Sequence, residues 1–527
     1  MRILYNANIH TFDVSEPSAD AMLIDSGQIL AIGEKEDIFA IAPAFTARTD
    51  IEQQTIIPGL TDAHLHLQYY AKFLQQVDCE TSTRGECLQR ISARVSKTPP
   101  GSWVTGHGWN QNNWEEGFGD ASLLDTVAPE NPVYLTAKSL HASWVNTAAL
   151  KLAGINADTA DPQGGKIGRN ADGSPNGLLF ENAMQMVERV VPEPTNVQWV
   201  DQIYYAQQQL LRFGLTGVHD FDGYSCYETL KTIQQQDRLH LRVCKGLRQA
   251  DLLTAIHNGL FTGAGDKFLR IGSIKLFADG ALGPRTAAMF LPYENEPDNN
   301  GLLLLDHEQI LEIGKHAVDS GFSLAIHAIG DRANHEVITA YTQLRAYETQ
   351  KHLPHQRHRL EHAQVLAAED FSKLVTNSII ASVQPIHAPS DMYAADLRWG
   401  ERTRYAYAYQ TLARLDTALA FGSDAPVESP NPFLGLYAAV SRRRLDGSPD
   451  QNGWHPEQRL TLAQSLHAYT AGPAFAAGLE DKLGKLKPGY WADLIVLPRD
   501  PLIIPIDDLP NLLPTATMVG GEWVWSS

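Results

Sequence analysis

Apolar and polar residues follow two rhythms along this chain, and these rhythms divide it into parts. In residues 1–57 and 475–527, short segments alternate apolar and polar side chains between Gly, Asp and Ser turns, as in AMLIDSGQILAIG and WADLIVLPRD. Such alternation is typical of strands with one buried face. The pattern predicts strands at both ends of the chain, which form either one composite β-sandwich or two unrelated β extensions.

The middle of the chain, residues 58–474, alternates apolar runs with helical segments. DQIYYAQQQLLRFG is one such segment, and its closing Gly is typical of a helix C-cap. Alternation of strand and helix indicates a parallel sheet. The predicted strands are IIPGLTDAHLH, LTGVHDF, LHLRVCKGL, IGSIKLFADG, FSLAIHAIG, HRLEHAQ, SIIASVQP and ALAFGSDAP. Eight strands of this kind predict an α/β fold, a (β/α)8 TIM barrel.

One long interval breaks this rhythm between the first and second predicted strands. It covers about residues 70–200, is rich in Trp, Gly, Asn and Pro, and contains PVYLTA and a predicted helix, WVNTAALKLAG. An insertion after a barrel strand emerges at the C-terminal face of the barrel, where TIM-barrel active sites lie. We therefore expect a large insertion that caps the active site.

The amino-acid composition limits the kinds of binding partner and the cellular compartment that are expected for this protein. The 527 residues carry 42 Lys and Arg against 61 Asp and Glu, a formal net charge of −19, which disfavours nucleic acid and anionic membranes as partners. Four cysteines without CxxC spacing favour reduced thiols. The N-terminus does not resemble a signal peptide, and no apolar run is long enough to span a bilayer. We expect a soluble, cytoplasmic protein that binds a small molecule. The sequence leaves open whether the protein forms a homodimer.

The strongest local signal for chemistry is Asp62-Ala-His64-Leu-His66, at the end of the first predicted strand. Alternate residues of a strand share one face, so these three side chains are expected to point into the barrel. Two imidazoles at this spacing can chelate one metal ion. Alone, the HxH pattern is weak evidence in a chain with 19 histidines.

Further polar residues stand at the ends of other predicted strands. They are His327 in SLAIHAIGD, His362 in RLEHAQ and Asp424 in AFGSDAP. A single His at a strand end is more often a hydrogen-bonded core residue. Four His and one Asp at the strand ends where TIM-barrel catalysis occurs are harder to explain in that way.

With these motifs in place, the chain resembles the amidohydrolase superfamily. The resemblance rests on PGLTDAHLH, a Lys on the fourth strand, single His residues on the fifth and sixth, an Asp on the eighth, and ADLIVL near the C-terminus. GWNQNNW, KLFADGALGPRTA, HAIGDRA and RLEHAQ resemble more closely the branch that includes N-substituted formamide deformylase. The resemblance implies the β-sandwich and a bound metal.

The resemblance also implies a ligand set. His64, His66 and Asp424 would hold the more buried of two divalent ions, His327 and His362 the outer one, and a carboxylated Lys275 would bridge them. Zinc is favoured, although Fe, Mn and Co suit the same ligands. A lysine of depressed pKa can add carbon dioxide and become an anionic bridge. The alternatives are a lysine paired with a carboxylate such as Asp279, and one ion held by His64, His66, His327 and Asp424.

By the same resemblance, the predicted reaction is hydrolysis of a non-peptide amide-type C–N bond, in an N-formyl, N-acyl or cyclic amide. The metals would generate the attacking hydroxide, and Asp424 would act as general base and then as general acid. One alternative is a deaminase of the same superfamily with a single metal. The other is a non-catalytic regulatory homologue, which the filled ligand positions disfavour.

The remaining candidates carry weaker signals. His141, Trp109 and Asn110 lie in the insertion, where they either face the substrate or hold the insertion together. Arg285 either binds a substrate carboxylate or carbonyl or forms a salt bridge. Two further histidines, His219 and His387, are expected to line the pocket without binding metal. GALG and GGKIGRN lack the strand-to-helix context of a phosphate loop, which excludes nucleotide binding.

Overall fold

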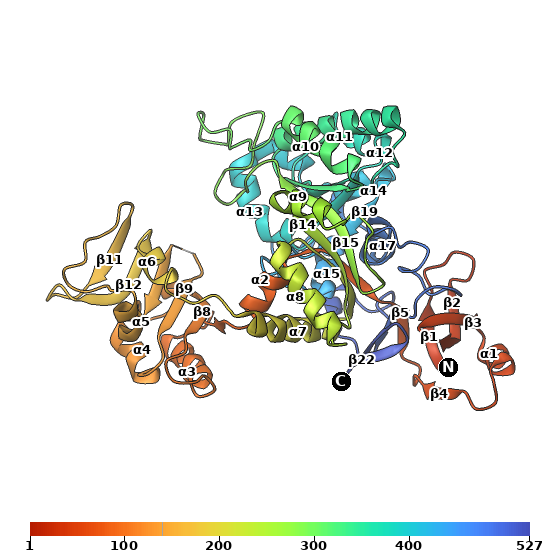
Figure 1. The fold of residues 1–527 in the computed structure, drawn as a ribbon, viewed down its shortest axis with the longest axis horizontal. Helices are drawn as coiled ribbons and strands as arrows, with labels where there is room; N and C mark the ends of the chain where they lie inside the picture. Colours follow the sequence, from red (N-terminus) through yellow and green to blue (C-terminus); the bar gives the residue numbers. More distant parts are fainter. Residues whose placement is uncertain (140) are drawn as a thin grey trace. The chain divides into compact units, whose positions relative to one another are not determined.

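The computed structural model describes residues 1–139 and 141–527, and the chain divides into two compact units. Unit 1 comprises Met1–Tyr70 and Ile203–Ser527, and unit 2 comprises Ala71–Gln202 (Figure 1). The residues of unit 2 are those that the sequence pattern assigns to the insertion. That the insertion caps the active site stays a prediction.

A parallel sheet of eight strands forms the centre of unit 1, in the order β19-β18-β17-β16-β15-β14-β13-β6. Its strands are β6 Leu60–Leu65, β13 Leu215–Asp220, β14 Arg242–Arg248, β15 Leu269–Phe277, β16 Leu324–Ala328, β17 Arg359–His362, β18 Ile380–Val383 and β19 Leu419–Phe421. Each contains residues of one predicted strand, so the α/β barrel expected from the apolar pattern is confirmed. Nearly every residue of these strands is buried, as expected for a sheet covered on both faces.

The first and last barrel strands meet along a seam just beyond β19. The Asp424 N–H donates to the His64 carbonyl over 2.7 Å, and the His66 N–H donates to the Ala425 carbonyl over 2.8 Å. These bonds connect the segments that carry the two end strands of the sheet, β6 and β19. These backbone hydrogen bonds alone therefore place His64, His66 and Asp424 beside one another.

Asp62 stabilises this seam rather than facing the cavity with the two histidines. Its carboxylate accepts hydrogen bonds from the Ser423 N–H at 3.1 Å, the Ser423 hydroxyl at 2.5 Å and the His64 N–H at 3.0 Å. A glycine is required beside it, because a Cβ on Gly422 would lie 2.5 Å from the His64 nitrogen. Burial raises the pKa of Asp62 to about 7 despite these donors.

Helices follow most barrel strands, and the local sequence explains several of their ends. The Asp306 side chain caps α10 through the Gln309 N–H, and the Gln309 side chain bonds back to the Asp306 N–H, which forms a capping box. The helices of unit 1 beyond β13 are α8 Tyr224–Gln235, α9 Leu252–His257, α10 His307–Asp319, α11 Asp331–Lys351, α12 Phe371–Thr376, α13 His387–Trp399, α14 Tyr409–Arg414, α15 Pro432–Ser441, α16 Leu462–Tyr469 and α17 Ala471–Ala476.

Both termini contribute strands to a second sheet of unit 1, ordered β22-β21-β20-β5-β1-β2-β3, with β4 paired to β1. The strands are β1 Arg2–His10, β2 Ser18–Asp25, β3 Gln28–Gly33, β4 Ala47–Asp50, β5 Thr55–Pro58, β20 Leu494–Leu497, β21 Ala516–Val519 and β22 Glu522–Ser526, and α1 Lys35–Ile41 follows β3. One hydrophobic core includes Ile9 and Met22 from the N-terminal part and Leu494 and Met518 from the C-terminal part. The two ends of the chain therefore share one sheet, whereas the two-layered sandwich stays a prediction.

The apolar run IIPGLTDAHLH serves two sheets rather than one strand. Its first part is β5, which pairs with β20, and its second part is β6, which pairs with β13. Gly59 lies between them, where a Cβ would come within 2.3 Å of the Thr216 side chain. The strand predicted over 56–66 is thus corrected to two strands that diverge at a glycine.

Unit 2 has its own sheet, ordered β11-β12-β10-β9-β8-β7. Its strands are β7 Val77–Asp78, β8 Val104–Trp109, β9 Val133–Ala137, β10 Ala142–Val145, β11 Gly165–Arg169 and β12 Pro175–Glu181, and its helices are α3 Arg84–Val95, α4 Ala121–Val127, α5 Thr147–Leu152 and α6 Met184–Glu188. Two further helices, α2 Leu67–Phe73 and α7 Asn196–Arg212, carry the chain out of unit 1 and back. Trp109, Trp114 and Trp144 pack together in the core of unit 2.

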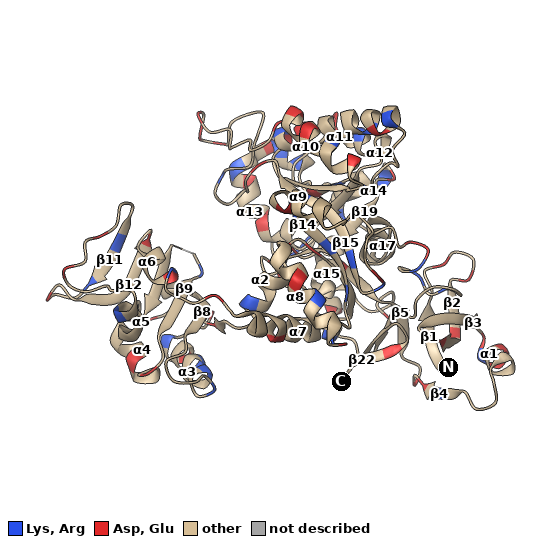
Figure 2. Ribbon diagram, viewed as in Figure 1, with Lys and Arg blue, Asp and Glu red and all other residues tan. Residues whose placement is uncertain are grey.

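Acidic and basic side chains are distributed over both units, as Figure 2 shows. Within residues 1–139 and 141–527, no helix is both long and apolar enough to cross a membrane.

Candidate metal centre

The predicted site residues lie at the carboxyl ends of the barrel strands. Parallel strands present these ends at one edge of a barrel, so residues far apart in sequence meet there. His64 belongs to β6, with His66 directly after the strand, and Asp424 follows β19. The others are Lys275 in β15, His327 in β16 and His362 at the end of β17.

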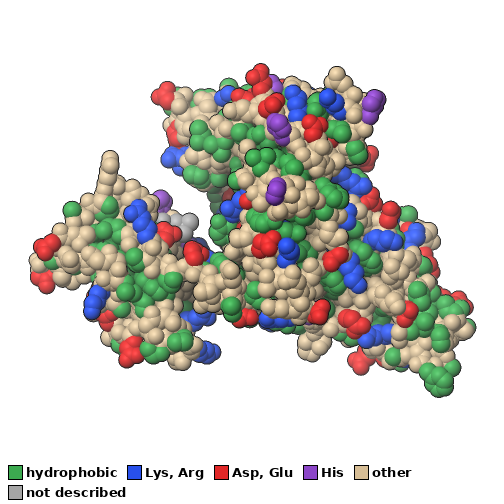
Figure 3. Space-filling model, viewed as in Figure 1, with side chains coloured by type: hydrophobic (Ala, Val, Ile, Leu, Met, Phe, Trp, Pro, Cys, Tyr) green, Lys and Arg blue, Asp and Glu red, His purple; other side chains and the backbone are tan. Residues whose placement is uncertain are grey.

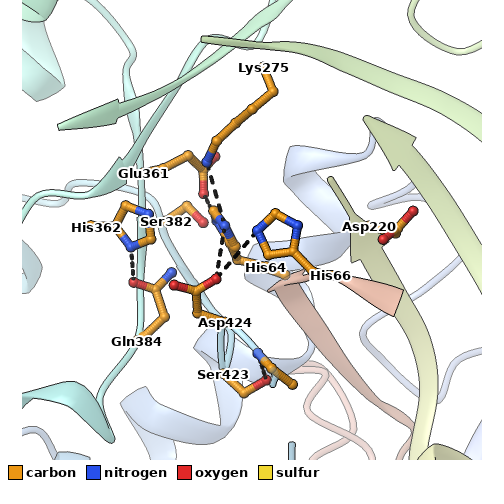
Figure 4. A network of polar contacts seen from close by, with 12 residues as sticks. His64, His66, Asp220, Lys275, Glu361, His362, Ser382, Gln384, Ser423 and Asp424 are labelled. Carbon is orange, nitrogen blue, oxygen red and sulfur yellow. Dashed lines mark hydrogen bonds and ion pairs between the residues drawn. The ribbon is translucent and has the colours of Figure 1, made fainter. Parts of the chain in front are cut away.

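The structure brings these side chains together (Figure 4). The Nε2 atoms of His64 and His66 each lie 3.6 Å from Oδ1 of Asp424, and Nζ of Lys275 lies 3.5 Å from Nε2 of His64. The His362 ring centroid lies 4.8 Å from that of His64 and 4.6 Å from that of His327. Ligand atoms of His64, His362 and Asp424 all lie within 4.8 Å of one another. That trio combines residues that the predicted ligand set divides between two ions.

Three of the histidines make the same kind of hydrogen bond through Nδ1. The acceptor is Glu361 for His64 at 2.5 Å, Asp222 for His66 at 3.1 Å and the Gln384 amide oxygen for His362 at 2.8 Å. When Nδ1–H donates, the lone pair of the neutral ring is on Nε2, so the partner determines which nitrogen can bind a metal.

His327 uses the opposite nitrogen. Its Nε2–H donates to the Gly280 carbonyl over 2.8 Å, which leaves the lone pair on Nδ1. Each of the four rings therefore has one nitrogen that donates to a protein acceptor and one whose lone pair is available to a metal, although that nitrogen of His64 also lies 3.5 Å from Nζ of Lys275.

Burial keeps three of these rings neutral, which is the form that binds metal. It lowers the pKa of His64 and His362 well below the ordinary value and that of His327 to about 3, and the neighbouring cationic groups act in the same direction. His66 differs. Burial lowers its pKa, but the hydrogen bond and charge of Asp222 outweigh burial and raise it.

Lys275 is buried beside these rings and between two aromatic faces. Its Nζ lies 4.8 Å from the Phe221 ring centroid and 5.2 Å from that of Phe277. Burial lowers its pKa to about 8, although the negative charges of Glu361 and Asp424 oppose the shift. A substantial fraction of free amine near neutral pH is what carboxylation requires.

Asp279 does not serve as the partner of Lys275. Its carboxylate accepts backbone N–H groups from Ala288, Ile329 and Gly330 at 2.8 to 3.0 Å. Burial raises its pKa to about 7. The carboxylate therefore organises the loops after β15 and β16, and the ordinary ion pair considered for Lys275 is not formed.

Two proposed ligands have strained backbones. His362 has φ of +71° and Asp424 has φ of +60°, in the left-handed region that residues other than glycine seldom adopt. Strain of this kind is held in place by the surrounding fold and concentrates at functional sites.

A buried network beneath the site orients Glu361. The Arg359 guanidinium donates to Glu361 at 2.7 Å, to the Ser382 hydroxyl at 2.7 Å and to Nδ1 of His219 at 2.6 Å. His219 therefore contacts this network rather than a ligand position. The sequence pattern indicated His219 but missed Glu361, Asp222 and Gln384. The local signals were the Glu next to His362 in RLEHAQ, the spaced carboxylates of HDFD and the Gln in SVQP.

His387 lies beside the metal-ligand cluster. Its ring stacks on that of His362, with centroids 6.4 Å apart and planes 8° apart. Its Nε2 is buried, and among the residues that the structure describes it has no hydrogen-bond partner. The predicted position next to the ligands, without a role in the ligand trio, fits this geometry.

The candidates outside the cluster have structural partners. Trp109 is 1 % exposed and its indole N–H donates to the Leu135 carbonyl, so it holds unit 2 together, the second of its two predicted roles. Asn110 accepts the Asn112 N–H, and His141 contacts Glu181 at 3.0 Å.

Arg285 is likewise engaged. It forms an ion pair with Glu296, which also contacts Arg398 at 3.3 Å. The salt bridge predicted as the alternative for Arg285 is therefore formed.

A second group of possible ligands, Asp220, Asp222 and Cys226, is also buried. Here Nζ of Lys245 lies 3.0 Å from Asp220 and donates to the backbone carbonyls of Asp222 and Gly246. The ammonium group provides the positive charge that a metal ion would otherwise bring. This group therefore supports the fold and, through Asp222, the orientation of His66.

Comparison with known proteins agrees with the geometry. The model of the "Amidohydrolase family" matches residues 49–525. The chain belongs to the amidohydrolase family. It is 32% identical to Protein LONG AFTER FAR-RED 3 of Arabidopsis thaliana, over 94% of this chain and 86% of that protein. It is 28% identical to N-substituted formamide deformylase of Arthrobacter pascens, over 98% and 97%.

A solved structure also matches nearly the whole amidohydrolase chain. The crystal structure of an uncharacterized metal-dependent hydrolase from Pyrococcus furiosus superimposes with a TM-score of 0.78 at 26% identity, over 95% of this chain and 99% of that one. The resemblance inferred from the sequence motifs is thus confirmed at the level of the family.

Proposed function

We propose that this protein is a metal-dependent amidohydrolase that cleaves a non-peptide amide-type C–N bond. The observation that carries the proposal is the set of hydrogen bonds that leaves one nitrogen lone pair available to a metal on each of His64, His66, His327 and His362 around Asp424. Imidazole nitrogens and a carboxylate suit divalent zinc, iron, manganese or cobalt, so the donor set fits the implied metal.

The residues that would hold two ions, with zinc favoured, are His64, His66, His327, His362, Asp424 and a carboxylated Lys275. The burial and lowered pKa of Lys275 support the bridging role. The hydrogen-bond acceptors behind the rings support high affinity, because they fix the tautomer and raise the basicity of each ligand.

The ions, when bound, lower the pKa of a water molecule towards neutrality and polarise a carbonyl group. Asp424 accepts the proton as the water oxygen attacks the carbonyl carbon. The same carboxylate returns this proton to the leaving nitrogen as the C–N bond breaks, which yields a carboxylic acid and an amine. The Asp424 N–H donates to the His64 carbonyl, which fixes the residue so that its carboxylate lies 3.6 Å from Nε2 of His64 and of His66.

Two alternatives lead to different observations. A deaminase would attack an aromatic ring carbon, release ammonia and require one ion per chain, and the ligand trio of His64, His362 and Asp424 is compatible with a single ion. A non-catalytic regulatory homologue would not need an intact ligand set, whereas all positions are filled here. The similarity to N-substituted formamide deformylase favours an N-formyl or related amide.

The test combines metal content with a substrate panel. Metal-replete protein is assayed against N-formyl amines, N-acyl amino acids and cyclic amides, with elemental analysis of the same sample. We expect amine release from at least one class, about two ions per chain, and loss of activity after chelation that zinc restores. Ammonia release with one ion would establish the deaminase alternative, and a metal-loaded protein inactive on every class would overturn the proposal.

A further inference from the structure

The structure has a cavity of about 650 Å³ in unit 2 and one of about 630 Å³ in unit 1. Only the second includes a residue of the candidate metal centre. Lys275 lines it, together with its strand neighbours Leu276 and Phe277, and the Phe277 ring centroid lies 5.3 Å from that of His327. Its volume is within the usual range for small-molecule sites.

The walls of this cavity are largely apolar. Phe277 is 45 % exposed, Leu304 is 47 % exposed and Leu253, on α9, is 80 % exposed. Hydrophobic side chains reach the surface around α9 in Figure 3. Exposed apolar side chains that gather at the edge of a polar site indicate where the apolar part of a ligand binds.

One charged side chain besides Lys275 lines the cavity, and this is Arg248. It ends β14 and is the register partner of Lys275 on the adjacent parallel strand, so both side chains stand at the same level of the sheet. The guanidinium hydrogen-bonds the Tyr69 side chain. Across residues 1–139 and 141–527 the guanidinium forms no ion pair, although the negative charges of Asp222 and Asp251 act on it from a greater distance.

Within the described residues, some arginines of this chain form ion pairs and others, Arg248 and Arg414 among them, form none. Arg242, Arg285 and Arg357 each pair with an acidic side chain, and the chain has a net charge of −19. An arginine that forms no ion pair, beside an apolar wall and at the level of Lys275, is suited to bidentate binding of an anionic group on a ligand.

We propose that Arg248 binds the carboxylate of the substrate, and that the substrate is an amide bearing both a carboxylate and an apolar group, as in an N-acylated apolar amino acid. The amide would lie at the metal centre, the apolar group against Phe277, Leu253 and Leu304, and the carboxylate against Arg248. This inference rests on the proposed function, since it names the substrate class for the same site.

The test compares N-formyl-phenylalanine with its carboxamide, in wild type and in Arg248→Met. Charge-assisted bidentate bonds typically change affinity by roughly 10- to 100-fold, so the ratio of kcat/KM for the acid over that for the carboxamide should fall by about this factor in the variant, mainly through KM. Arg248→Lys should recover part of the loss. Arg414→Met, at an exposed arginine that ends α14, is the matched control and should leave the ratio unchanged.

A binding measurement separates the inference from the proposed function. Calorimetric titration with 3-phenylpropanoate and with 3-phenylpropanamide requires no catalysis. We expect the acid to bind wild type more tightly than Arg248→Met, by roughly the same factor, while the amide shows no such difference. Hydrolysis of both formyl compounds with a ratio that Arg248→Met does not alter would overturn the inference and leave the proposed function standing. Absence of hydrolysis together with Arg248-dependent binding of the acid would support the role of Arg248 and count against the proposed hydrolase function.

Discussion

Two groups of ionisable side chains are buried in the barrel, and they compensate their burial in different ways. At the ends of β13 and β14, Asp220 and Asp222 face Lys245, and the ammonium group contacts a carboxylate and two backbone carbonyls. At the ends of β6, β17 and β19, His64, His362 and Asp424 converge without an ammonium group bound to the carboxylate, and each ring has one nitrogen whose lone pair is available to a metal.

The difference shows that burial and acidic residues do not by themselves make a metal site. Both groups satisfy a distance criterion for ligands, but the first already contains its own cation, and removal of one partner would leave a buried charge unpaired. In the second, Lys275 stands beside His64 but forms no ion pair with Asp424 within the described residues, so the carboxylate stays available to an ion from outside the chain. The following predictions test this contrast, from the largest expected effect to the smallest.

Asp424→Asn should reduce kcat by about 10² to 10⁴, roughly 3 to 5 kcal/mol of barrier, because an amide retains the shape of the carboxylate but cannot accept and return a proton. The measurement is kcat at saturating substrate, with metal content determined in the same sample. More than about a tenth of wild-type kcat with metals in place would show that another group moves the proton, and His387 would be the next variant to make.

Lys245→Met should lower the free energy of unfolding by about 3 to 5 kcal/mol, because Asp220 and Asp222 would be buried without their cation. Denaturant titration of metal-replete protein measures the change. The double variant with Asp220→Asn is the control, and it should be more stable than the single variant because one uncompensated charge is removed with its partner. Equal stability of the single variant and wild type would show that Lys245 does not compensate these carboxylates.

Chelation of the metals should lower the free energy of unfolding by about 2.7 kcal/mol for each ion present at a hundredfold excess over its Kd, since an ion that binds only the folded state stabilises it. Thermal unfolding with and without chelator gives this shift. Glu348→Gln should lose the same increment as wild type, because Glu348 contacts Arg345 and His358 rather than either group. If chelation leaves Tm unchanged, the second group does not hold a stabilising ion.

Glu361→Gln should weaken zinc binding by roughly 10- to 100-fold, since the charge that accepts the His64 Nδ1–H raises the basicity of that ligand. Competition with a chromophoric chelator measures the affinity. Glu348→Gln is the matched control, because Glu348 is a buried carboxylate that contacts a buried His and an Arg away from the cluster. Equal zinc affinities in the two variants would contradict the role assigned to Glu361.

The barrel and the ligand positions were accessible from sequence because each depends on local pattern. Buried strands appear as apolar runs, and the ligands stand at the ends of those runs. The break at Gly59 was not accessible in this way. IIP and LTDAHL are both buried, so the apolar pattern is continuous although the two segments belong to different sheets.

The partners of the ligands could not be predicted, because they are set by tertiary contacts. His64 and Glu361 are 297 residues apart, and nothing local to either indicates that they meet. The same holds for Arg248, since the sequence does not indicate which arginines form ion pairs. Absence of a partner is a property of the folded surface and leaves no trace in the sequence around the residue.

The seam between β6 and β19 has a consequence for how the protein acquires its metals during synthesis. Asp62 and Ser423, which bond across it, are 361 residues apart. At about 5 to 20 residues per second, a ribosome needs roughly 20 to 70 s to travel from one to the other. Throughout that interval the nascent chain displays the HxH pair without the carboxylate that completes the cluster. If these residues bind metal as proposed, the complete ligand cluster forms only late in synthesis, and an ion captured earlier by the two histidines would bind to a barrel that has not yet closed.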